Sequence, residues 1–304
     1  MSRPRIAVLG SANIDLVCRV PRLPRPGETI RATDVSRYRG GKGANQAVGA
    51  ARLGADVRFF GMVGADPFGD TILAGFEKSR VDASAVDRPA ACSTGTATIW
   101  VADTGENAIV ISEGANGHVD AAYVDRHLGA LSEADVLLLQ LEIPVETVAH
   151  VVRRLPPGKP WIVLDPAPAA PLDGIDASRL ACITPNEEEL YTLSGATEVD
   201  AGIDALRRLG VEWVVCTLGE SGARAARDGE PPFSCEAFPV AAVDTTAAGD
   251  AFAAALAVGL AGENPGDLRG IVRSACAAGA LAASKPGAWP SLPTEEEVRA
   301  LLER

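Results

Sequence analysis

Short apolar segments alternate along the chain with longer segments whose apolar residues recur at helical spacing. Several short segments are continuously apolar, which is typical of strands covered by helices on both faces. This alternation predicts an α/β fold built on a mostly parallel sheet. The predicted strands are Ile6–Leu9, Val57–Gly61, Val136–Leu141, Trp161–Asp165, Cys182–Thr184 and Trp213–Thr217. The predicted helices are Ala44–Leu53, Asp70–Ser79, Ala121–Leu131, Val145–Arg154, Glu187–Ser194, Gly202–Leu209, Ala248–Leu260, Asp267–Ser284 and Thr294–Leu302.

Two stretches interrupt this rhythm. Asp15–Gly40 contains three prolines and alternating segments rather than a helical pattern. Thr94–Ile111 is typical of two strands, Gly95–Ala102 and Asn107–Ile111, joined by a turn at Gly105. Both stretches suit a small β-rich insert, which is either a lid over an active site or a pair of surface hairpins. We expect one catalytic domain over residues 1–304, with a lid formed by about 13–40 and 94–112.

Composition narrows the function classes. The chain has 304 residues, and its hydrophobic share of 47% is enough for a large core. Its net charge of -12 would repel nucleic acid. A phosphorylated ligand is not excluded, because a local glycine-rich site can bind phosphate within an acidic protein. The six cysteines and three histidines show no metal-site spacing. Without an apolar run long enough for a signal peptide or a membrane span, we expect a soluble cytoplasmic protein with reduced thiols.

A run of small residues near the C-terminal third has the composition of an anion hole. Ala247, Ala248 and Gly249 allow close approach of the backbone to a ligand. The apolar helical pattern Ala251–Ala261 follows, so N–H groups without partners lie at a helix N-terminus, where the dipole favours negative charge. Asp250 would then be a base beside the anion, or alternatively a simple helix cap.

The run Gly40–Ala47 is a second glycine-rich segment and opens a helix. It does not match the P-loop pattern, and no G-x-G-x-x-G follows the first strand, which removes the main support for a dinucleotide site. Its glycines let the backbone approach a polyhydroxylated ligand, with Asn45 able to donate and accept. Asn13 and Asp15 alternate and therefore share one face, which suits sugar hydroxyls, although a polar turn is the alternative.

Polar residues also follow predicted strands directly. Glu142, Asp165 and Asn186 each lie just after a strand, and ligands of open α/β sheets bind at that edge. Thr217–Gly222 follows a fourth strand and contains two glycines, so it could hold a nucleotide phosphate.

Taken together, these segments resemble the ribokinase family of sugar and nucleoside kinases over essentially the whole chain. Eight segments in the family's order carry the resemblance: Gly10–Asp15, Gly40–Gln46, Gly61–Gly69, Gly114–Asn116, Asp165–Pro168, Thr184–Glu188, Thr217–Gly222 and Asp244–Asp250. The resemblance implies a three-layer α/β/α fold with a small β-sheet lid.

The resemblance also implies roles for matched positions. Asp250 would be the catalytic base, with the anion hole formed by Ala247, Ala248 and Gly249. The sugar would be held by Asn13, Asp15, Gly41, Lys42, Asn45, Glu142 and Asp250. ATP would contact Asn186, Thr217, Gly219, Gly222 and Gly249, with Glu189 reaching Mg²⁺ through water. The potassium-binding loops would comprise Asp244, Thr246, Ala282, Lys285, Gly287 and Ser291.

We therefore expect an ATP-dependent kinase acting on the primary 5-hydroxyl of a small sugar, with D-ribose first among the candidates and with Mg²⁺ and K⁺ as cofactors. A homodimer is expected through the lid strand Thr98–Val101. A kinase for another sugar or a nucleoside stays open, as does a non-catalytic sugar-binding protein. Asp250 beside an anion hole argues against the last alternative, because binding alone needs no base.

Overall fold

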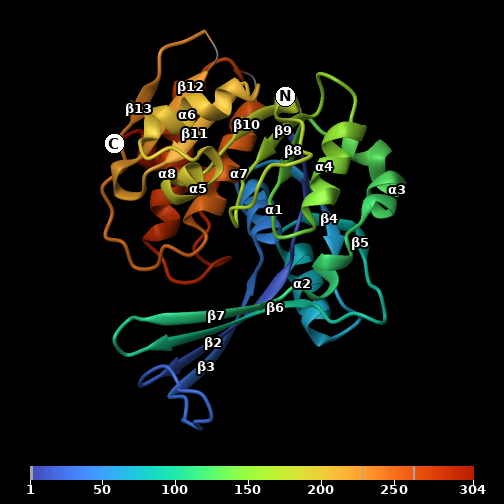
Figure 1. The fold of residues 1–304 in the computed structure, drawn as a ribbon, viewed down its shortest axis with the longest axis vertical. Helices are drawn as coiled ribbons and strands as arrows, with labels where there is room; N and C mark the ends of the chain where they lie inside the picture. Colours follow the sequence, from blue (N-terminus) through green and yellow to red (C-terminus); the bar gives the residue numbers. More distant parts are fainter. Residues whose placement is uncertain (1–2, 228, 263) are drawn as a thin grey trace.

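The architecture is a large sheet between two helical layers, with a smaller sheet at one side (Figure 1). The computed structural model describes residues 3–227, 229–262 and 264–304. Within them, the nine-stranded sheet has the order β13-β12-β11-β10-β9-β8-β1-β4-β5 and the four-stranded sheet the order β3-β2-β6-β7. The large sheet is parallel from β11 to β5, and the antiparallel strands β12 and β13 extend it, with β13 at the edge.

The elements have the following bounds. The strands are β1 Arg5–Leu9, β2 Asn13–Val20, β3 Asp34–Gly40, β4 Asp56–Met62, β5 Val81–Asp87, β6 Gly95–Ala102, β7 Asn107–Ser112, β8 Val136–Leu139, β9 Trp161–Leu164, β10 Leu180–Ile183, β11 Trp213–Thr217, β12 Ala223–Arg227 and β13 Phe233–Cys235. The α-helices are α1 Lys42–Arg52, α2 Pro67–Lys78, α3 Ala121–Ser132, α4 Val145–Arg154, α5 Glu187–Ser194, α6 Val199–Arg208, α7 Ala248–Leu260, α8 Leu268–Ala283 and α9 Glu295–Leu302.

Two hydrophobic cores lie on the two faces of the large sheet. Successive residues of a strand point to opposite faces, so Val8 belongs to one core and Leu9 to the other. The first core packs the sheet against α1, α2, α7, α8 and α9, and the second packs it against α3, α4, α5 and α6. The predicted three-layer α/β/α fold is therefore confirmed, and its parallel strands end together at one edge.

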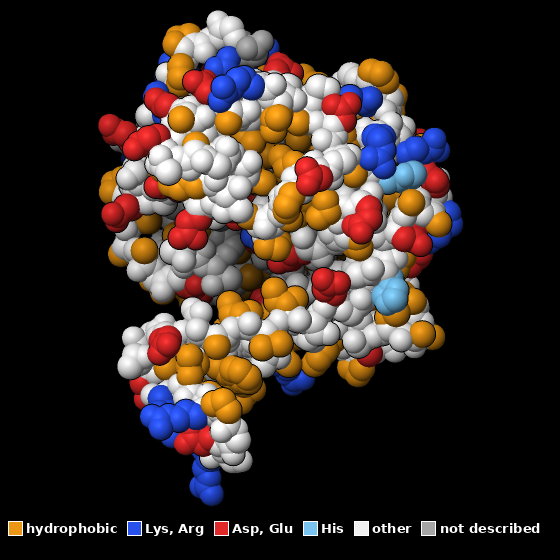
Figure 2. All heavy atoms as spheres, viewed as in Figure 1, with side chains coloured by type: hydrophobic (Ala, Val, Ile, Leu, Met, Phe, Trp, Pro, Cys, Tyr) orange, Lys and Arg blue, Asp and Glu red, His pale blue; other side chains and the backbone are white. Residues whose placement is uncertain are grey.

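The four-stranded sheet stands away from the body (Figure 1). Its strands fall within the two segments that interrupt the helical rhythm of the sequence. In its register Asp15 lies opposite Tyr38 on β3 and Ala97 on β6, and Ala97 lies opposite Ile111 on β7. These four residues therefore share one face, and we call this sheet the lid. Figure 2 shows a hollow between the lid and the body, with hydrophobic side chains on the visible surface of the lid.

Several element boundaries differ from the sequence prediction. β8 ends at Leu139 rather than at Leu141, and β10 begins at Leu180 rather than at Cys182. Helix α2 begins at Pro67, three residues before the predicted start, because the Asp66 side chain accepts from the Gly69 N–H and caps it. Helix α6 likewise begins early, at Val199.

Three strands have no counterpart in the prediction: β5, β12 and β13. β5 is an edge strand with the sequence VDASAVD, and β12 reads ARAAR, so neither presents the continuous apolar run of the central strands. β5 is placed in the sheet by its pairing with β4, and β12 by its pairing with β11, rather than by an apolar sequence of its own.

Candidate active site

Asp250 lies at the carboxyl edge of the sheet, in the first turn of α7, and only 5% of its surface is exposed. Its carboxylate accepts from Asn45 Nδ2 at 2.7 Å and from Gln46 Nε2 at 3.1 Å, both on α1. Helices α1 and α7 lie side by side, which brings these residues together across the whole chain (Figure 1). The N-cap of α7 is Ala247, so the alternative that Asp250 merely caps this helix is wrong.

Gln46 joins two carboxylates through one amide. Its Nε2 also donates to Asp165 Oδ2 at 2.8 Å, and its Oε1 accepts from Gln140 Nε2 at 2.5 Å. The Gln140 bond fixes which end of the Gln46 amide faces the carboxylates. Sequence reasoning missed the roles of both glutamines, although Gln46 lies inside the glycine-rich segment Gly40–Ala47 that it had singled out.

Lys42 lies among the carboxylates and does not simply point to solvent. Burial acts to lower the pKa of Lys42, but the negative charges of Asp165, Asp250, Glu142 and Glu189 outweigh it and raise that pKa above its usual value. Lys42 is therefore the positive charge around which the acidic side chains of the site gather.

Three aspartates of the cluster have raised pKa values. Burial, followed by the negative charges of Glu142 and Asp250, raises the pKa of Asp15 to about 7. Burial raises the pKa of Asp165 to about 7 against the opposing effect of Lys42. Burial also raises the pKa of Asp250, while the charge of Lys42 and the amide hydrogen bonds act in the opposite direction. Perturbed carboxylates at the end of a parallel sheet mark a functional site.

Asn13 and Asp15 are on β2, so the alternative of a polar turn does not hold. Asn13 Oδ1 accepts from Asn116 Nδ2 at 2.7 Å, and Asn116 Oδ1 accepts from the Ala12 N–H at 3.0 Å. A side chain at Gly40 would collide with the Asp15 carboxylate, so this glycine leaves the space that the carboxylate occupies. Asn116 is a further residue whose contribution the sequence did not indicate.

Glu142 ties the end of the first strand to the start of α1. It accepts from Ser11 Oγ at 2.5 Å and from the Lys42 N–H at 2.9 Å. Gly41, the N-cap of α1, has φ 86°, and a Cβ there would meet the Asn13 N atom at 2.7 Å. Glu142 and Gly41 thus shape the site, and direct contact with a sugar stays a prediction for both.

The start of α7 has backbone donors of the kind an anion hole needs. The Ala248 N–H donates to Thr245 O at 3.1 Å, so it is already used within the turn. Among the described residues, no backbone oxygen accepts from the N–H of Gly249 or Asp250. The position of a Gly249 Cβ is open space, which leaves room for a ligand beside these donors. Of the predicted hole residues, Ala248 is thus the one whose N–H is already used, whereas the N–H groups of Ala247 and Gly249 have no backbone acceptor among the described residues.

The residues predicted to hold ATP lie along the ends of β10 and β11. Asn186 and Glu189 form a capping box at the start of α5, each side chain accepting from the other's N–H at 2.8 Å. Asn186 also pairs with Thr217, so these two predicted residues are brought together. Gly219 has φ 56° and open space where a Cβ would lie.

Gly222 closes the turn that follows β11, and its contact with a nucleotide phosphate stays a prediction. Its N–H donates to Gly219 O at 3.1 Å, and its own oxygen accepts from the Leu218 N–H at 2.8 Å. A Cβ at this position would collide with Cys235 O. Gly222 is therefore a turn residue that lets β12 pack against β13.

The predicted potassium loops meet at Asp244. Its carboxylate accepts from the Thr246 N–H at 2.9 Å and from the Gly287 N–H at 2.8 Å. Burial would raise the pKa of Asp244, but these donors outweigh it and hold that pKa below its usual value.

The other residues of the predicted potassium loops have contacts of their own. Ser291 is fully buried and donates to Ala288 O at 2.7 Å. The Lys285 ammonium pairs with Glu297 at 2.5 Å, and Ala282 O accepts from the Lys285 N–H at 3.1 Å.

Comparison with known proteins shows to which family the chain belongs. Residues 3–295 match the pfkB family of carbohydrate kinases. The chain belongs to that family. It is 40% identical to the ribokinase of Schizosaccharomyces pombe, over 96% of each chain, and 37% identical to that of Haemophilus influenzae, over 99% of each. The structure of Arabidopsis thaliana ribokinase complexed with ribose and ATP superposes with a TM-score of 0.93 at 33% identity, covering 100% of both chains.

Membership of the pfkB family makes the chain a carbohydrate kinase and confirms the resemblance noted in the sequence. None of the helices within the described residues is both long and apolar enough to cross a bilayer.

Proposed function

We propose that this kinase transfers the γ-phosphoryl group of ATP to the primary 5-hydroxyl of D-ribose. The observation that carries the proposal is Asp250, buried at the start of α7 beside the unused N–H groups of Gly249 and Asp250. Its position supports a base next to an anion hole, and the relatives with full-length coverage are ribokinases. The six cysteines are free, which is consistent with a cytoplasmic location.

In the proposed reaction Asp250 accepts the proton of the sugar hydroxyl as that oxygen attacks phosphorus. Burial raises the pKa of Asp250, which makes its carboxylate a stronger base. The N–H groups at the start of α7 stabilise the negative charge on the transferring phosphoryl group. Asn45 Oδ1 is buried without a hydrogen-bond partner in the described structure, so it is available to a sugar hydroxyl.

Asp15 and Asn13 hold the other hydroxyls of the sugar in this proposal. The lid face that carries Asp15 also carries Ala97 and Ile111, which contact the sugar as apolar walls. A ribose hydroxyl that donates to Asp15 stabilises the ionised carboxylate and lowers its raised pKa.

The residues present fit the two cations that the family implies. Mg²⁺ would be held mainly by the ATP phosphates and water, with Glu189 reaching it through water, and it would neutralise phosphate charge. K⁺ would be held by Asp244 together with loop carbonyls near Gly287, with Ser291 supporting the loop. Asp244 retains lone pairs beyond its two hydrogen bonds, and a carboxylate among carbonyls is an oxygen donor set suited to a hard cation.

A coupled ADP-release assay over a panel of sugars and nucleosides tests the proposal. D-ribose should give the highest kcat/KM, and ADP release without an acceptor should be slow. A preference for another pentose, a hexose or a nucleoside would replace ribose while keeping Asp250 as the base. Tight ribose binding without any ADP release would instead favour a non-catalytic sugar-binding protein.

A second prediction concerns K⁺. Asp244 lies two residues before Thr246 in the loop that presents the anion hole, so a cation there acts by ordering donors rather than by joining the reaction. We expect K⁺ to raise kcat, Na⁺ to substitute poorly, and Asp244→Ala to lose most of the K⁺ response. Equal rates with and without K⁺ in a Na⁺-free buffer would contradict the cation site and leave the kinase proposal intact.

A further inference from the structure

A groove of about 960 Å³ lies between β3 of the lid and the helices α1 and α2 of the body. Five of its lining residues are cationic: Arg37, Arg39, Arg52, Lys78 and Arg80. No aspartate or glutamate is among the residues that line it. A concentration of positive charge is unexpected on a chain whose net charge is -12.

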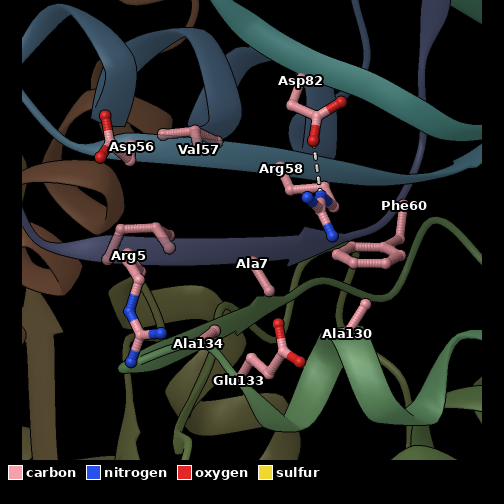
Figure 3. Close-up of a pocket in the computed structure, with 11 residues that line it drawn as sticks. Arg5, Ala7, Asp56, Val57, Arg58, Phe60, Asp82, Ala130, Glu133 and Ala134 are labelled. Carbon is pink, nitrogen blue, oxygen red and sulfur yellow. Dashed lines mark hydrogen bonds and ion pairs between the residues drawn. The ribbon is translucent and has the colours of Figure 1, made fainter.

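None of these five side chains forms an ion pair within the part of the chain that the structure describes. Glu297, whose charge acts on Arg52, is itself paired with Lys285 at 2.5 Å. A pocket elsewhere on the protein, lined by Arg5, Arg58 and Asp82 among others, shows the contrast (Figure 3). There Arg58 pairs with Asp82 at 2.6 Å, so carboxylates balance the cations.

Two of the guanidinium groups are held in place. Arg39 Nε donates to Thr71 O at 2.8 Å, and its guanidinium lies over the Trp289 ring, 5.5 Å from the centroid. Arg52 Nη1 donates to Leu292 O at 2.5 Å. These bonds to neutral carbonyls orient the side chains without neutralising them, and the carboxylate whose charge acts on Arg52, Glu297, is shared with Lys285.

Trp289 also lines the groove and packs against Arg39. Its ring stacks on Phe76 at 5.5 Å, and its Nε1 is buried without a hydrogen-bond partner in the described structure. A buried donor normally has a partner, because leaving it unsatisfied costs free energy. The ring of Trp289 meanwhile supports the Arg39 guanidinium at one wall of the groove.

Three of the four lid residues that line the groove, Ile14, Arg37 and Arg39, lie on the face opposite to that of Asp15, whereas the fourth, Tyr38, lies on the Asp15 face. Arg37 and Arg39 belong to the lid, whereas Arg52, Lys78 and Arg80 belong to the body. A ligand there would contact both parts at once.

We propose that this groove binds a small polyanion with two or more phosphate groups. Arginine forks suit phosphate oxygens, and five cations around one cavity match several negative charges. The acidic surface of the rest of the chain would repel an extended polyanion such as nucleic acid, which restricts the ligand to a molecule that fits the groove.

Calorimetric titration with inorganic tripolyphosphate tests the proposal, in saturating ADP so that the probe is kept from the nucleotide site. Arg37→Gln/Lys78→Gln removes two exposed cations of the groove. The matched control, Arg25→Gln/Arg31→Gln, removes two exposed cations from the lid loop between β2 and β3. We expect one saturable site in the wild type, a Kd raised at least about tenfold in the groove variant, and about twofold or less in the control.

Absence of saturable binding would overturn the proposal, as would an equal loss in both double variants, which would indicate only a general charge effect. Sedimentation of the same variants tests the alternative that a second copy of the chain occupies the groove. If the groove variant changes the oligomeric state and the control does not, the groove is an interface and the ligand proposal fails. Because the readout is binding, a different sugar specificity would not affect the result.

Discussion

At the scale of single residues, the site is a cluster of carboxylates around one ammonium. Asp250 and Asp165 are joined through Gln46, and Lys42 lies among them. The sequence indicated Asp250 and Lys42 because they stand in glycine-rich segments with recognisable chemistry. It did not indicate Gln140, which lies one residue past β8 and acts only through Gln46. A residue such as Gln140, whose role is to orient another side chain, is not part of any recognisable sequence motif.

The Gln46 amide should set the acidity of the base. Its hydrogen bond lowers the pKa of Asp250, so Gln46→Met removes that effect and raises this pKa. Because Asp250 must be ionised to accept a proton, the acid limb of the kcat–pH profile should move to higher pH. The measurement is kcat from pH 5.5 to pH 8.5 at saturating substrates.

Gln140→Met serves as the companion variant, since it keeps the direct bonds to the carboxylates and loses only the one that orients Gln46. It should shift the acid limb in the same direction by a smaller amount. A uniformly lower kcat with an unmoved profile in Gln46→Met would mean that Gln46 is only structural.

At the scale of elements, the start of α7 combines the anion hole with backbone strain. Ala247 has φ 62° and ψ 10°, the left-handed conformation that costs a non-glycine residue about 1–2 kcal/mol. Small residues were expected here for close approach of a ligand, and the sequence does not show which of them adopts the left-handed conformation. The same applies to Gly222, whose turn depends on the distant strand β13.

Alanine-to-glycine variants at the adjacent positions 247 and 248 distinguish relief of backbone strain from loss of helix propensity. Ala247→Gly should leave stability unchanged or raise it by up to about 1 kcal/mol, because relief of strain exceeds the added chain entropy. Ala248→Gly lies within the helix and should cost about 0.5–1 kcal/mol. Urea unfolding of both variants measures the two values. Equal destabilisation by both would contradict the assignment of strain to Ala247.

At the scale of the whole molecule, alternation of apolar segments was enough to predict the layers. Strands buried on both faces are continuously apolar, so β8, β9, β10 and β11 and most of β1 were recognisable, and β4 was recognised although it contains the exposed Arg58. The strands β5, β12 and β13 were missed because their sequences lack the continuous apolar run of the central strands. Strand order and the junction of α1 with α7 depend on contacts across the chain, which local pattern does not encode.

The prediction about oligomeric state concerns the lid, through which a homodimer is expected. Ile109 and Val110 are adjacent on β7 and similarly exposed, at 53% and 57%, but they point to opposite faces. Ile109 shares the face of Tyr38 and Ile111, which are also exposed apolar residues. If a homodimer forms through this face, Ile109→Lys should give monomers, whereas Val110→Lys should not. Analytical ultracentrifugation decides, and a monomeric wild type would contradict the dimer.

The central claim is that Asp250 is the base of a sugar kinase, and its most direct test is the turnover of Asp250→Asn. Asparagine keeps the size of the side chain and cannot accept the hydroxyl proton, so kcat with D-ribose and ATP should fall by roughly 10²–10⁴. Circular dichroism and ADP titration should show an unchanged fold and nucleotide affinity. A variant that folds, binds ADP and keeps more than about a tenth of the wild-type kcat would contradict the account.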